Sequence, residues 1–309
     1  MTTALISHDD CLAHDTGIGH PENAGRIRAI NDRLMQTQLF DWLAHVDAPL
    51  ATREALLRAH TPEHVDKVFS LFPREDSTYL DPDTVACPQS LTAALRAAGA
   101  VVEGVDRVMR GDNPNAFCLV RPPGHHAESD KPMGFCFFNN VAVGVGHLLK
   151  NYPVERIAVL DFDVHQGNGT EEIFLDDERI IFCSTYQHPF YPHSPVYPET
   201  YRQVSIPLDA TAKSEEFRAA VTDHWLPALE RFEPEFIFIS AGFDAHRDDD
   251  MSSVSLTDAD YQWVTEKIMA VAEKYAGGRV VSSLEGGYEY RSLARSVERH
   301  LRVLMGQQG

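Results

Sequence analysis

The chain has 309 residues, of which 43% are hydrophobic and 24% charged, and its formal net charge is −19 at pH 7. It has no apolar run of about 18 residues that could cross a bilayer, and no cluster of Lys and Arg that could bind a nucleic-acid backbone. The composition therefore argues against a membrane protein and against a nucleic-acid partner, and the length suits a single large domain over residues 1–309.

The N-terminus and the cysteines indicate a cytoplasmic protein. The first ten residues, MTTALISHDD, lack the basic region and the long apolar core of a signal peptide. The five cysteines are odd in number, scattered and without a CxxC motif, which is typical of reduced thiols rather than of disulfides or a cysteine zinc site. We therefore expect any metal ligands among the His and Asp residues.

Apolar, strand-like segments alternate along the chain with segments of helical periodicity. The expected strands are 2–7, 116–120, 156–162, 179–185, 235–240 and 279–284, and the expected helices lie near 22–38, 61–72, 89–110, 139–150, 214–231, 257–275 and 290–305. Strands that are almost continuously apolar are typical of a parallel sheet covered on both faces. The pattern predicts an α/β fold with a mostly parallel central sheet and helices on both faces, and it leaves the Pro-rich stretch 188–200 as a long surface loop.

Polar, glycine-containing motifs follow four of the expected strands. In chain order they are RPPGHHAE, DFDVHQGNG, AGFDAHRDD and EGGYEY. In an open α/β sheet, ligands bind outside the carboxyl ends of the strands. We therefore expect these four segments to converge on one site.

Asp161, Asp163 and His165 stand at alternate positions, so extended chain would point all three to one face. Such groups are costly in apolar surroundings unless they are paired or bind a cation. A second interpretation places the acids in solvent, where they cap the helix that begins in GNGTEEIF. Asp244 offers a further ligand, and with Asp163 and His165 it makes two carboxylates and one imidazole, which leave a fourth position open as a catalytic zinc requires.

The tandem histidines His125 and His126 follow the turn-forming sequence RPPG. Either could act as a general base tuned by a carboxylate such as Asp161, or both could be exposed turn residues. Tyr288 follows two glycines that let the backbone approach a ligand, and its phenol could donate to an oxyanion, although a lone tyrosine is more often a core or rim residue.

Taken together and in this order, RPPGHHAE, GFCFFNN, DFDVHQGNGTEEIF, SAGFDAHRDD and EGGYEY resemble the zinc-dependent histone deacetylase family. The similarity is greatest to the class II members and their bacterial relatives, which include acetylpolyamine amidohydrolases, and with GIGHPENAGRIRAI near the N-terminus it covers nearly the whole chain. The resemblance implies the arginase-deacetylase fold. It also implies an amidohydrolase that removes an acetyl group from acetyl-lysine side chains or, alternatively, from an acetylpolyamine or another small N-acylated amine.

The resemblance assigns roles to individual residues. Zn²⁺, which would activate water and polarise the amide carbonyl, would be held by Asp163, His165 and Asp244. The catalytic set would be His126 as general base and then acid, His125 as its electrostatic partner bonded to Asp161, Asn168 as the group that orients His126, and Tyr288 as the oxyanion donor. A structural potassium ion would be bound by Asp161, Asp163, His165, Ser184 and Thr185. The substrate would contact Phe135 and Gly134 in the tunnel, Ser77 at the rim, Met251 and Gly287.

The sequence also departs from the family pattern. Gln166 stands where the family commonly has a second histidine, and the loop after HPFYP lacks the frequent PGTG, which leaves the second tunnel wall unassigned. Met251 occupies the position of the glutamate of polyamine-selective relatives, although the neighbouring Asp248, Asp249 and Asp250 could still attract a cation.

Two further hypotheses compete with a one-metal deacetylase. A two-metal ureohydrolase of the related arginase fold would require more bridging acids, and His246 stands two residues after Asp244 instead of a carboxylate. A non-catalytic acyl-lysine binding module is disfavoured because Tyr288 and both tandem histidines are present. A homo-oligomer could complete the rim of the site with a neighbour's loop.

Overall fold

An eight-stranded sheet forms the centre of the molecule, and the computed structural model describes it within residues 2–72, 75–196 and 198–307. The strand order is β2-β1-β5-β10-β9-β6-β7-β8, and each neighbouring pair is parallel. The strands are β1 (Ala4–Ser7), β2 (Ala44–Asp47), β5 (Asn115–Cys118), β6 (Ile157–Asp161), β7 (Ile180–Gln187), β8 (Gln203–Leu208), β9 (Phe236–Ala241) and β10 (Val280–Leu284). A separate antiparallel hairpin pairs β3 (Thr78–Tyr79) with β4 (Val85–Ala86).

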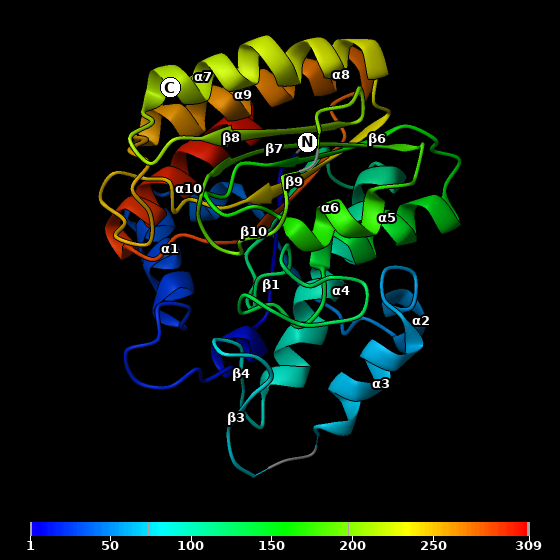
Figure 1. Cartoon of the computed structure of the whole chain (residues 1–309), viewed down its shortest axis with the longest axis vertical. Helices are drawn as coiled ribbons and strands as arrows, with labels where there is room; N and C mark the ends of the chain where they lie inside the picture. Colours follow the sequence, from blue (N-terminus) through cyan, green and yellow to red (C-terminus); the bar gives the residue numbers. More distant parts are fainter. Residues whose placement is uncertain (1, 73–74, 197, 308–309) are drawn as a thin grey trace.

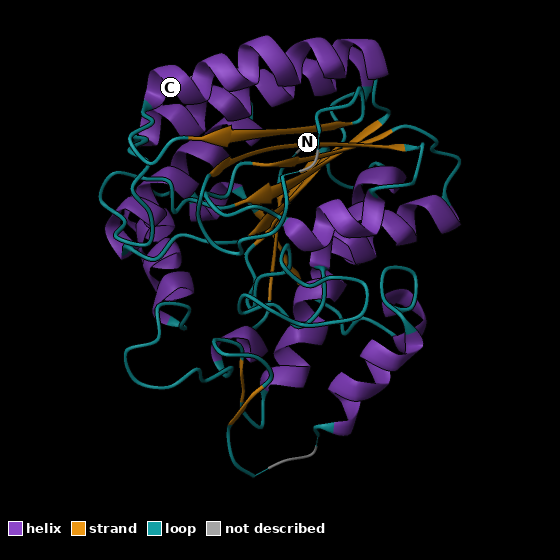
Figure 2. Ribbon diagram, in the orientation of Figure 1, coloured by secondary structure: helices purple, strands orange, loops and turns teal. Residues whose placement is uncertain are grey.

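Helices cover both faces of this sheet (Figures 1 and 2). One layer contains α1 (Gly25–Gln36), α7 (Ser214–Ala220), α8 (Leu226–Phe232), α9 (Asp258–Tyr275) and α10 (Tyr290–Leu304). The other contains α4 (Ser90–Arg110), α5 (Asn140–Asn151) and α6 (Asn168–Phe174), with α2 (Arg53–Leu56) and α3 (Pro62–Ser70) beyond them. The predicted single domain, with a parallel sheet flanked by helices on both faces, is therefore confirmed.

The six predicted strands are all present, but the two edge strands β2 and β8 are not predicted by the sequence pattern. β2 alternates half-buried and exposed residues, and β8 contains Pro207 and polar residues. Neither has the continuous apolar run of a strand that is covered on both faces, whereas all five residues of β6 are buried. The helix expected over 214–231 contains a π-helical turn, Val221–Trp225, between α7 and α8.

Side-chain caps fix the helices that lead to and from the motif loops. Asn139 caps α5 by accepting a hydrogen bond from the Ala142 N–H, and its amide donates to Ala127 O at 3.3 Å and to Thr170 Oγ1 at 3.0 Å. The motif GFCFFNN therefore does more than begin a helix, because Asn139 ties the loop after the tandem histidines to α6.

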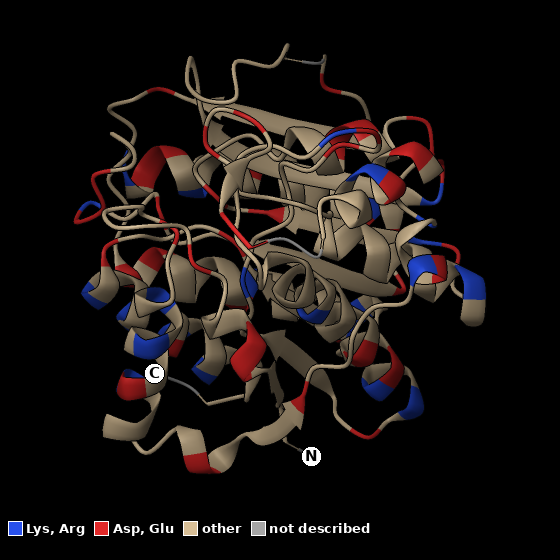
Figure 3. Cartoon of the chain, turned by 90° about the horizontal axis from the view of Figure 1, so that it is seen from below, with Lys and Arg blue, Asp and Glu red and all other residues tan. Residues whose placement is uncertain are grey.

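The five cysteines are buried and unpaired, in agreement with reduced thiols. Acidic and basic residues lie mainly on the helices and loops around the sheet (Figure 3). Within the described ranges, no helix is both long and apolar enough to span a bilayer.

Candidate active site

Four neighbouring strands in the middle of the sheet, β5, β10, β9 and β6, precede the four polar motifs. Because neighbouring strands are parallel, their carboxyl ends lie at the same edge of the sheet. Segments that are more than 150 residues apart in the chain, such as RPPGHH and EGGY, are brought together there.

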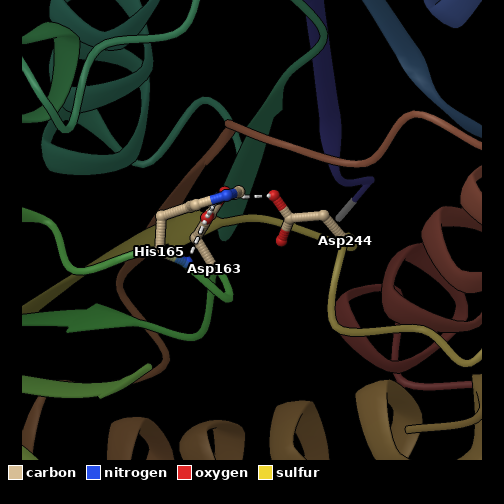
Figure 4. Close-up of side chains that lie close together, drawn as sticks. All are labelled: Asp163, His165 and Asp244. Atoms are coloured by element: carbon tan, nitrogen blue, oxygen red, sulfur yellow. Dashed lines mark hydrogen bonds and ion pairs between the residues drawn. The ribbon is translucent and has the colours of Figure 1, made fainter. Parts of the chain in front are cut away.

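Asp163, His165 and Asp244 form a buried cluster at this edge (Figure 4). One ligand atom from each residue lies within 4.8 Å of the other two. His165 Nδ1 is 3.0 Å from Asp163 Oδ1 and 3.1 Å from Asp244 Oδ2. Two carboxylates and one imidazole at these separations match the protein ligands of a catalytic zinc site, which leaves further positions open.

The electrostatics of the cluster favour an added positive charge. Burial alone would lower the pKa of His165, but its contacts with the Asp163 and Asp244 carboxylates raise that pKa to about 10. For Asp244, burial and the nearby Asp163 carboxylate raise the pKa to about 6. A divalent cation on the three residues would supply the charge that otherwise requires a proton on His165, so the residues present fit a metal ion.

Two glycines provide the space for these carboxylates. A Cβ atom on Gly242 would lie 2.0 Å from Asp163 Oδ2, and one on Gly286 would lie 2.1 Å from Asp244 Oδ2. The Gly286 N–H also donates to Asp163 Oδ2 at 2.8 Å. The motifs AGFD and EGGY therefore require glycine at these positions because any side chain would displace the carboxylates of Asp163 and Asp244.

Contrary to what the alternate spacing predicts, Asp161, Asp163 and His165 do not lie together on extended chain. β6 ends at Asp161, whose Oδ1 accepts the Asp163 N–H at 3.0 Å. Asp163 Oδ1 in turn accepts the His165 N–H at 2.9 Å. The backbone from Asp161 to His165 therefore forms two successive turns, and each turn is closed by an aspartate side chain that accepts the N–H two residues later.

The tandem histidines occupy two different environments. His125 Nδ1 lies 2.9 Å from Asp161 Oδ2, and His126 Nδ1 lies 2.8 Å from Asn168 Oδ1. Burial would lower the pKa of His125, but the Asp163 and Asp161 carboxylates raise it to about 10. Burial, together with the charges of His125 and His165, lowers the pKa of His126 well below its usual value. Surroundings that separate two titrating groups in this way leave His126 neutral and able to accept a proton.

Arg26 holds the backbone of the segment that carries Tyr288 by hydrogen bonds. Its Nε donates to Gly287 O at 2.6 Å, and its guanidinium also donates to Glu285 O. The Arg26 Cζ atom lies 4.9 Å from the centre of the Tyr288 ring. Gly287 has φ = 116°, a conformation in which a side chain is strained. Burial raises the pKa of the Tyr288 phenol well above its usual value, so this group stays protonated and remains a hydrogen-bond donor.

A cavity of about 190 Å³ reaches His165 of the cluster. Its lining residues are Asp83, His126, Gly134, Phe135, His165, Phe190, Tyr191, Met251 and Tyr288. Phe190 stacks on the His165 ring at 5.4 Å and 20°, and Tyr191 meets the His126 ring edge-on at 5.1 Å. These two residues belong to the 188–200 loop, in which residue 197 lies outside the described residues, and they line the cavity together with Phe135.

The expected rim role of Ser77 stays a prediction, and a second polar residue of the same motif reaches the cavity. Ser77 is exposed and is not among the residues that line the cavity, whereas Asp83 lines it. Asp83 lies in the turn between β3 and β4, where the neighbouring Thr84 Oγ1 also accepts the Phe135 N–H at 3.0 Å. The spacing of the motif DSTYLDPDT could not show which of its polar side chains the hairpin turns inward.

Asp249 also differs from its sequence interpretation. The sequence suggests that it could attract a cation together with Asp248 and Asp250, but Asp249 is only 4% exposed and its carboxylate accepts backbone N–H groups. Asp248 and Asp250 are exposed, and Gly287 does not line the cavity.

Comparisons with known proteins show the family of this chain. Residues 20–304 match the model of the histone deacetylase domain. The chain belongs to the histone deacetylase family. A probable deacetylase of Archaeoglobus fulgidus is 36% identical over 297 residues, which cover 93% of this chain and 82% of that protein. A histone deacetylase-like amidohydrolase of Pseudomonas aeruginosa is 35% identical over 277 residues, which cover 87% of this chain and 73% of that protein.

A solved structure of this family shows the same fold. The crystal structure of the HDA15 HD domain matches with a TM-score of 0.91 and 32% sequence identity, and the match covers 99% of this chain and 91% of that chain. This member of the histone deacetylase family is therefore related throughout its length to deacetylases and amidohydrolases, enzymes that act on acetylated substrates.

Two residues of the expected potassium set are buried in β7, the strand next to β6, in this family member. Ser184 pairs with Asp161 in the register of β7 and β6, and both are fully buried. Among the described residues, the Ser184 hydroxyl has no hydrogen-bond partner, and Thr185 is 3% exposed. A buried carboxylate beside a buried, unpaired hydroxyl is a chemically reasonable surrounding for a monovalent cation.

Proposed function

We propose that this chain is a zinc-dependent deacetylase that hydrolyses the side-chain amide of acetyl-lysine. The observation that supports this most directly is the buried cluster of Asp163, His165 and Asp244, which lies beside a neutral His126, with His126 and His165 both lining the cavity. The aromatic walls of the cavity suit the apolar methylene chain of an acyl-lysine.

In this proposal, hydrolysis adds the oxygen of water to the acetyl carbon, breaks the C–N bond and releases acetate and an amine. A divalent ion bound at the cluster supplies a Lewis acid, which lowers the pKa of water and polarises the amide carbonyl. His126 accepts a proton from the attacking water and passes it to the leaving amine, while Asn168 orients its ring. Tyr288 donates its hydroxyl to the carbonyl oxygen as negative charge develops there.

We also propose that a potassium ion binds beside this centre, held by Asp161, Asp163, His165, Ser184 and Thr185. The unpaired Ser184 hydroxyl and the buried Asp161 carboxylate support this site. Burial raises the pKa of Asp161, so a cation beside it would help to keep the carboxylate ionised while it bonds to His125.

A small N-acetylated polyamine is the alternative substrate, and Asp83 is the observation that favours it. This carboxylate lines the cavity and could bind a distal ammonium group. Met251, however, lines the same cavity with an apolar side chain at the position where polyamine-selective relatives carry a glutamate. We therefore favour the acetyl-lysine peptide.

A deacylation screen tests this proposal. The purified protein is assayed with acetyl-lysine peptides, acetylspermidine and longer acyl-lysine peptides, with and without a chelator, and its metal content is measured. We expect about one zinc per chain, loss of activity with the chelator, and a higher kcat/KM for acetyl-lysine peptides than for acetylspermidine. Two equivalents of manganese, or binding of acyl-lysine without turnover, would contradict the proposal.

Two variants sharpen the screen. Tyr288→Phe should lower kcat by roughly two to three orders of magnitude while zinc stays bound, because a single oxyanion donor is worth that much. Asp83→Asn should weaken turnover of acetylspermidine more than turnover of a neutral acetyl-lysine peptide, because it removes the charge that would bind an ammonium group. A higher kcat/KM for acetylspermidine that depends on Asp83 would establish the alternative substrate.

A further inference from the structure

A single buried carboxylate connects two residues that line the cavity. Asp249 Oδ2 accepts the N–H of Tyr288 at 2.6 Å and that of Glu289 at 3.0 Å. Asp249 Oδ1 accepts the N–H of Met251 at 3.0 Å. Both carboxylate oxygens of a residue that is 4% exposed thus accept backbone N–H groups, two of which belong to the cavity-lining residues Tyr288 and Met251.

The turn that carries Asp249 is itself anchored. Asp249 N–H donates to His246 O at 2.8 Å, and His246 Nε2 lies 3.2 Å from Asp258 Oδ1 at the start of α9. Asp249 is therefore held from the side of α9, while the Tyr288 segment is held on its carbonyl side by Arg26. The backbone around Tyr288 is therefore held by hydrogen bonds of two kinds. The Arg26 guanidinium donates to its carbonyl groups, and the Asp249 carboxylate accepts its N–H groups.

We infer that Asp249 is a positioning residue, which sets the height of the Tyr288 phenol above the acetyl carbonyl and couples it to Met251. The inference rests on the proposed role of Tyr288 as oxyanion donor. Asparagine cannot replace the aspartate, because one of its two terminal atoms is a donor and would face an N–H group. A hydrogen bond from a backbone N–H to an ionised carboxylate is also stronger than one to a neutral amide oxygen.

The competing explanation is that Asp249 merely stabilises the start of α10, where Glu289 is the N-cap residue. The two explanations differ in the effect of substituting Asp249 once the Tyr288 hydroxyl has been removed. If Asp249 positions the hydroxyl, the substitution no longer lowers kcat in its absence. If Asp249 only stabilises the fold, the substitution lowers kcat whether or not the hydroxyl is present. A double-mutant cycle measures this difference.

The experiment compares the zinc-loaded wild type, Asp249→Asn, Tyr288→Phe and the double variant on an acetyl-lysine peptide, with zinc content and thermal midpoint measured for each. We expect Asp249→Asn to lower kcat on the order of 10- to 100-fold, the range that misplacement of a catalytic group produces. In the Tyr288→Phe background the same substitution should change kcat by less than about twofold. Asp250→Asn, at the exposed neighbouring position, serves as the matched control and should retain wild-type kcat.

Three outcomes decide the matter. Equal losses of kcat in both backgrounds, or a wild-type kcat in Asp249→Asn, would overturn the positioning role and leave the proposed function intact. A wild-type kcat in Tyr288→Phe would instead contradict the proposed function, and the inference would fall with it. If Asp249→Asn does not fold, Asp249→Glu, which keeps the charge and moves the acceptor by one methylene, replaces it in the same cycle.

Discussion

Gln166 illustrates how one residue can serve a loop and a helix together. Its Nε2 donates to Glu171 Oε2 in α6 at 2.8 Å and to Pro195 O in the 188–200 loop at 3.2 Å. The other oxygen of Glu171 accepts the Ser205 hydroxyl at 2.8 Å. One amide nitrogen carries two hydrogens, so it can make both bonds without a change of protonation. The loop that carries Phe190 and Tyr191 is thereby tied to the segment that carries His165.

Removal of the Gln166 donor should therefore affect substrate binding more than chemistry. Gln166→Met keeps the length of the side chain but cannot donate, and we expect it to raise KM for an acetyl-lysine peptide roughly 3- to 10-fold with a smaller change in kcat, the effect of one or two lost hydrogen bonds. Gln166→His retains a donor, and its KM should lie between those of the wild type and Gln166→Met. Steady-state kinetics at matched zinc content test this, and an unchanged KM in Gln166→Met would show that the loop does not depend on this contact.

At the scale of single residues, the sequence is most informative where chemistry demands particular side chains. Asp163, His165 and Asp244, which the structure brings together, can be selected from the sequence because two acids and a histidine that follow buried strands are typical metal ligands. That Asp83 lines the cavity could not be predicted, because the direction of a side chain in a short hairpin depends on the turn. The contacts of Gln166 and Asp249 join segments 29 and 39 residues apart, and no local pattern predicts such pairs.

At the scale of elements, close packing decides several positions. The contact between α4 and the chain around Pro49 leaves no space at Gly99, where a Cβ atom would lie 1.9 Å from Pro49 O. At Gly104 in the same helix, the nearest atom is a Val281 methyl carbon at 3.1 Å. The strand order, like these contacts, could not be read from periodicity, since the apolar pattern identifies buried strands and not their neighbours. The edge strands β2 and β8 escape prediction for the related reason that they are less apolar.

The two glycines of α4 should respond differently to alanine. Alanine favours a helix over glycine by about 1 kcal/mol. At Gly99 we expect a net loss of free energy of unfolding of about 1–2 kcal/mol, because a rigid backbone oxygen must move and overpacking costs more than the helix gains. At Gly104 the cost should be smaller, since a methyl group can adjust. Urea denaturation of both variants tests the order, and a Gly99→Ala protein as stable as wild type would contradict it.

At the scale of the whole molecule, buried histidines limit stability in acid. Burial lowers the pKa of His14 to about 4, and that of His60 and of His300 to about 3, from an ordinary value of 6.5. Because these folded-state pKa values are depressed, the unfolded chain binds protons more readily below pH 6.5, and the free energy of unfolding should fall as pH decreases from there. Each histidine contributes a slope of up to about 1.4 kcal/mol per pH unit.

His300 offers the clearest test of this acid sensitivity. Its ring bonds to Thr265 and Ser282 in the core, whereas His45 is exposed. Urea midpoints measured between pH 7.5 and pH 5 should show a shallower pH dependence for His300→Gln than for wild type, and an unaltered one for His45→Gln. Parallel curves for all three proteins would mean that other groups carry the acid sensitivity.

The reactivity of the buried cysteines can be used to measure how the folded chain opens. All five thiols are enclosed by the fold, and burial raises the pKa of Cys11 to about 11 and that of Cys118 and Cys183 further still. Since the thiolate is the reactive form, a disulfide reagent at neutral pH can modify these residues only while the chain is transiently open. Counting modified thiols against time would separate a concerted opening, in which all five react together, from local fraying that releases one thiol early and thereby locates the least stable part of the fold.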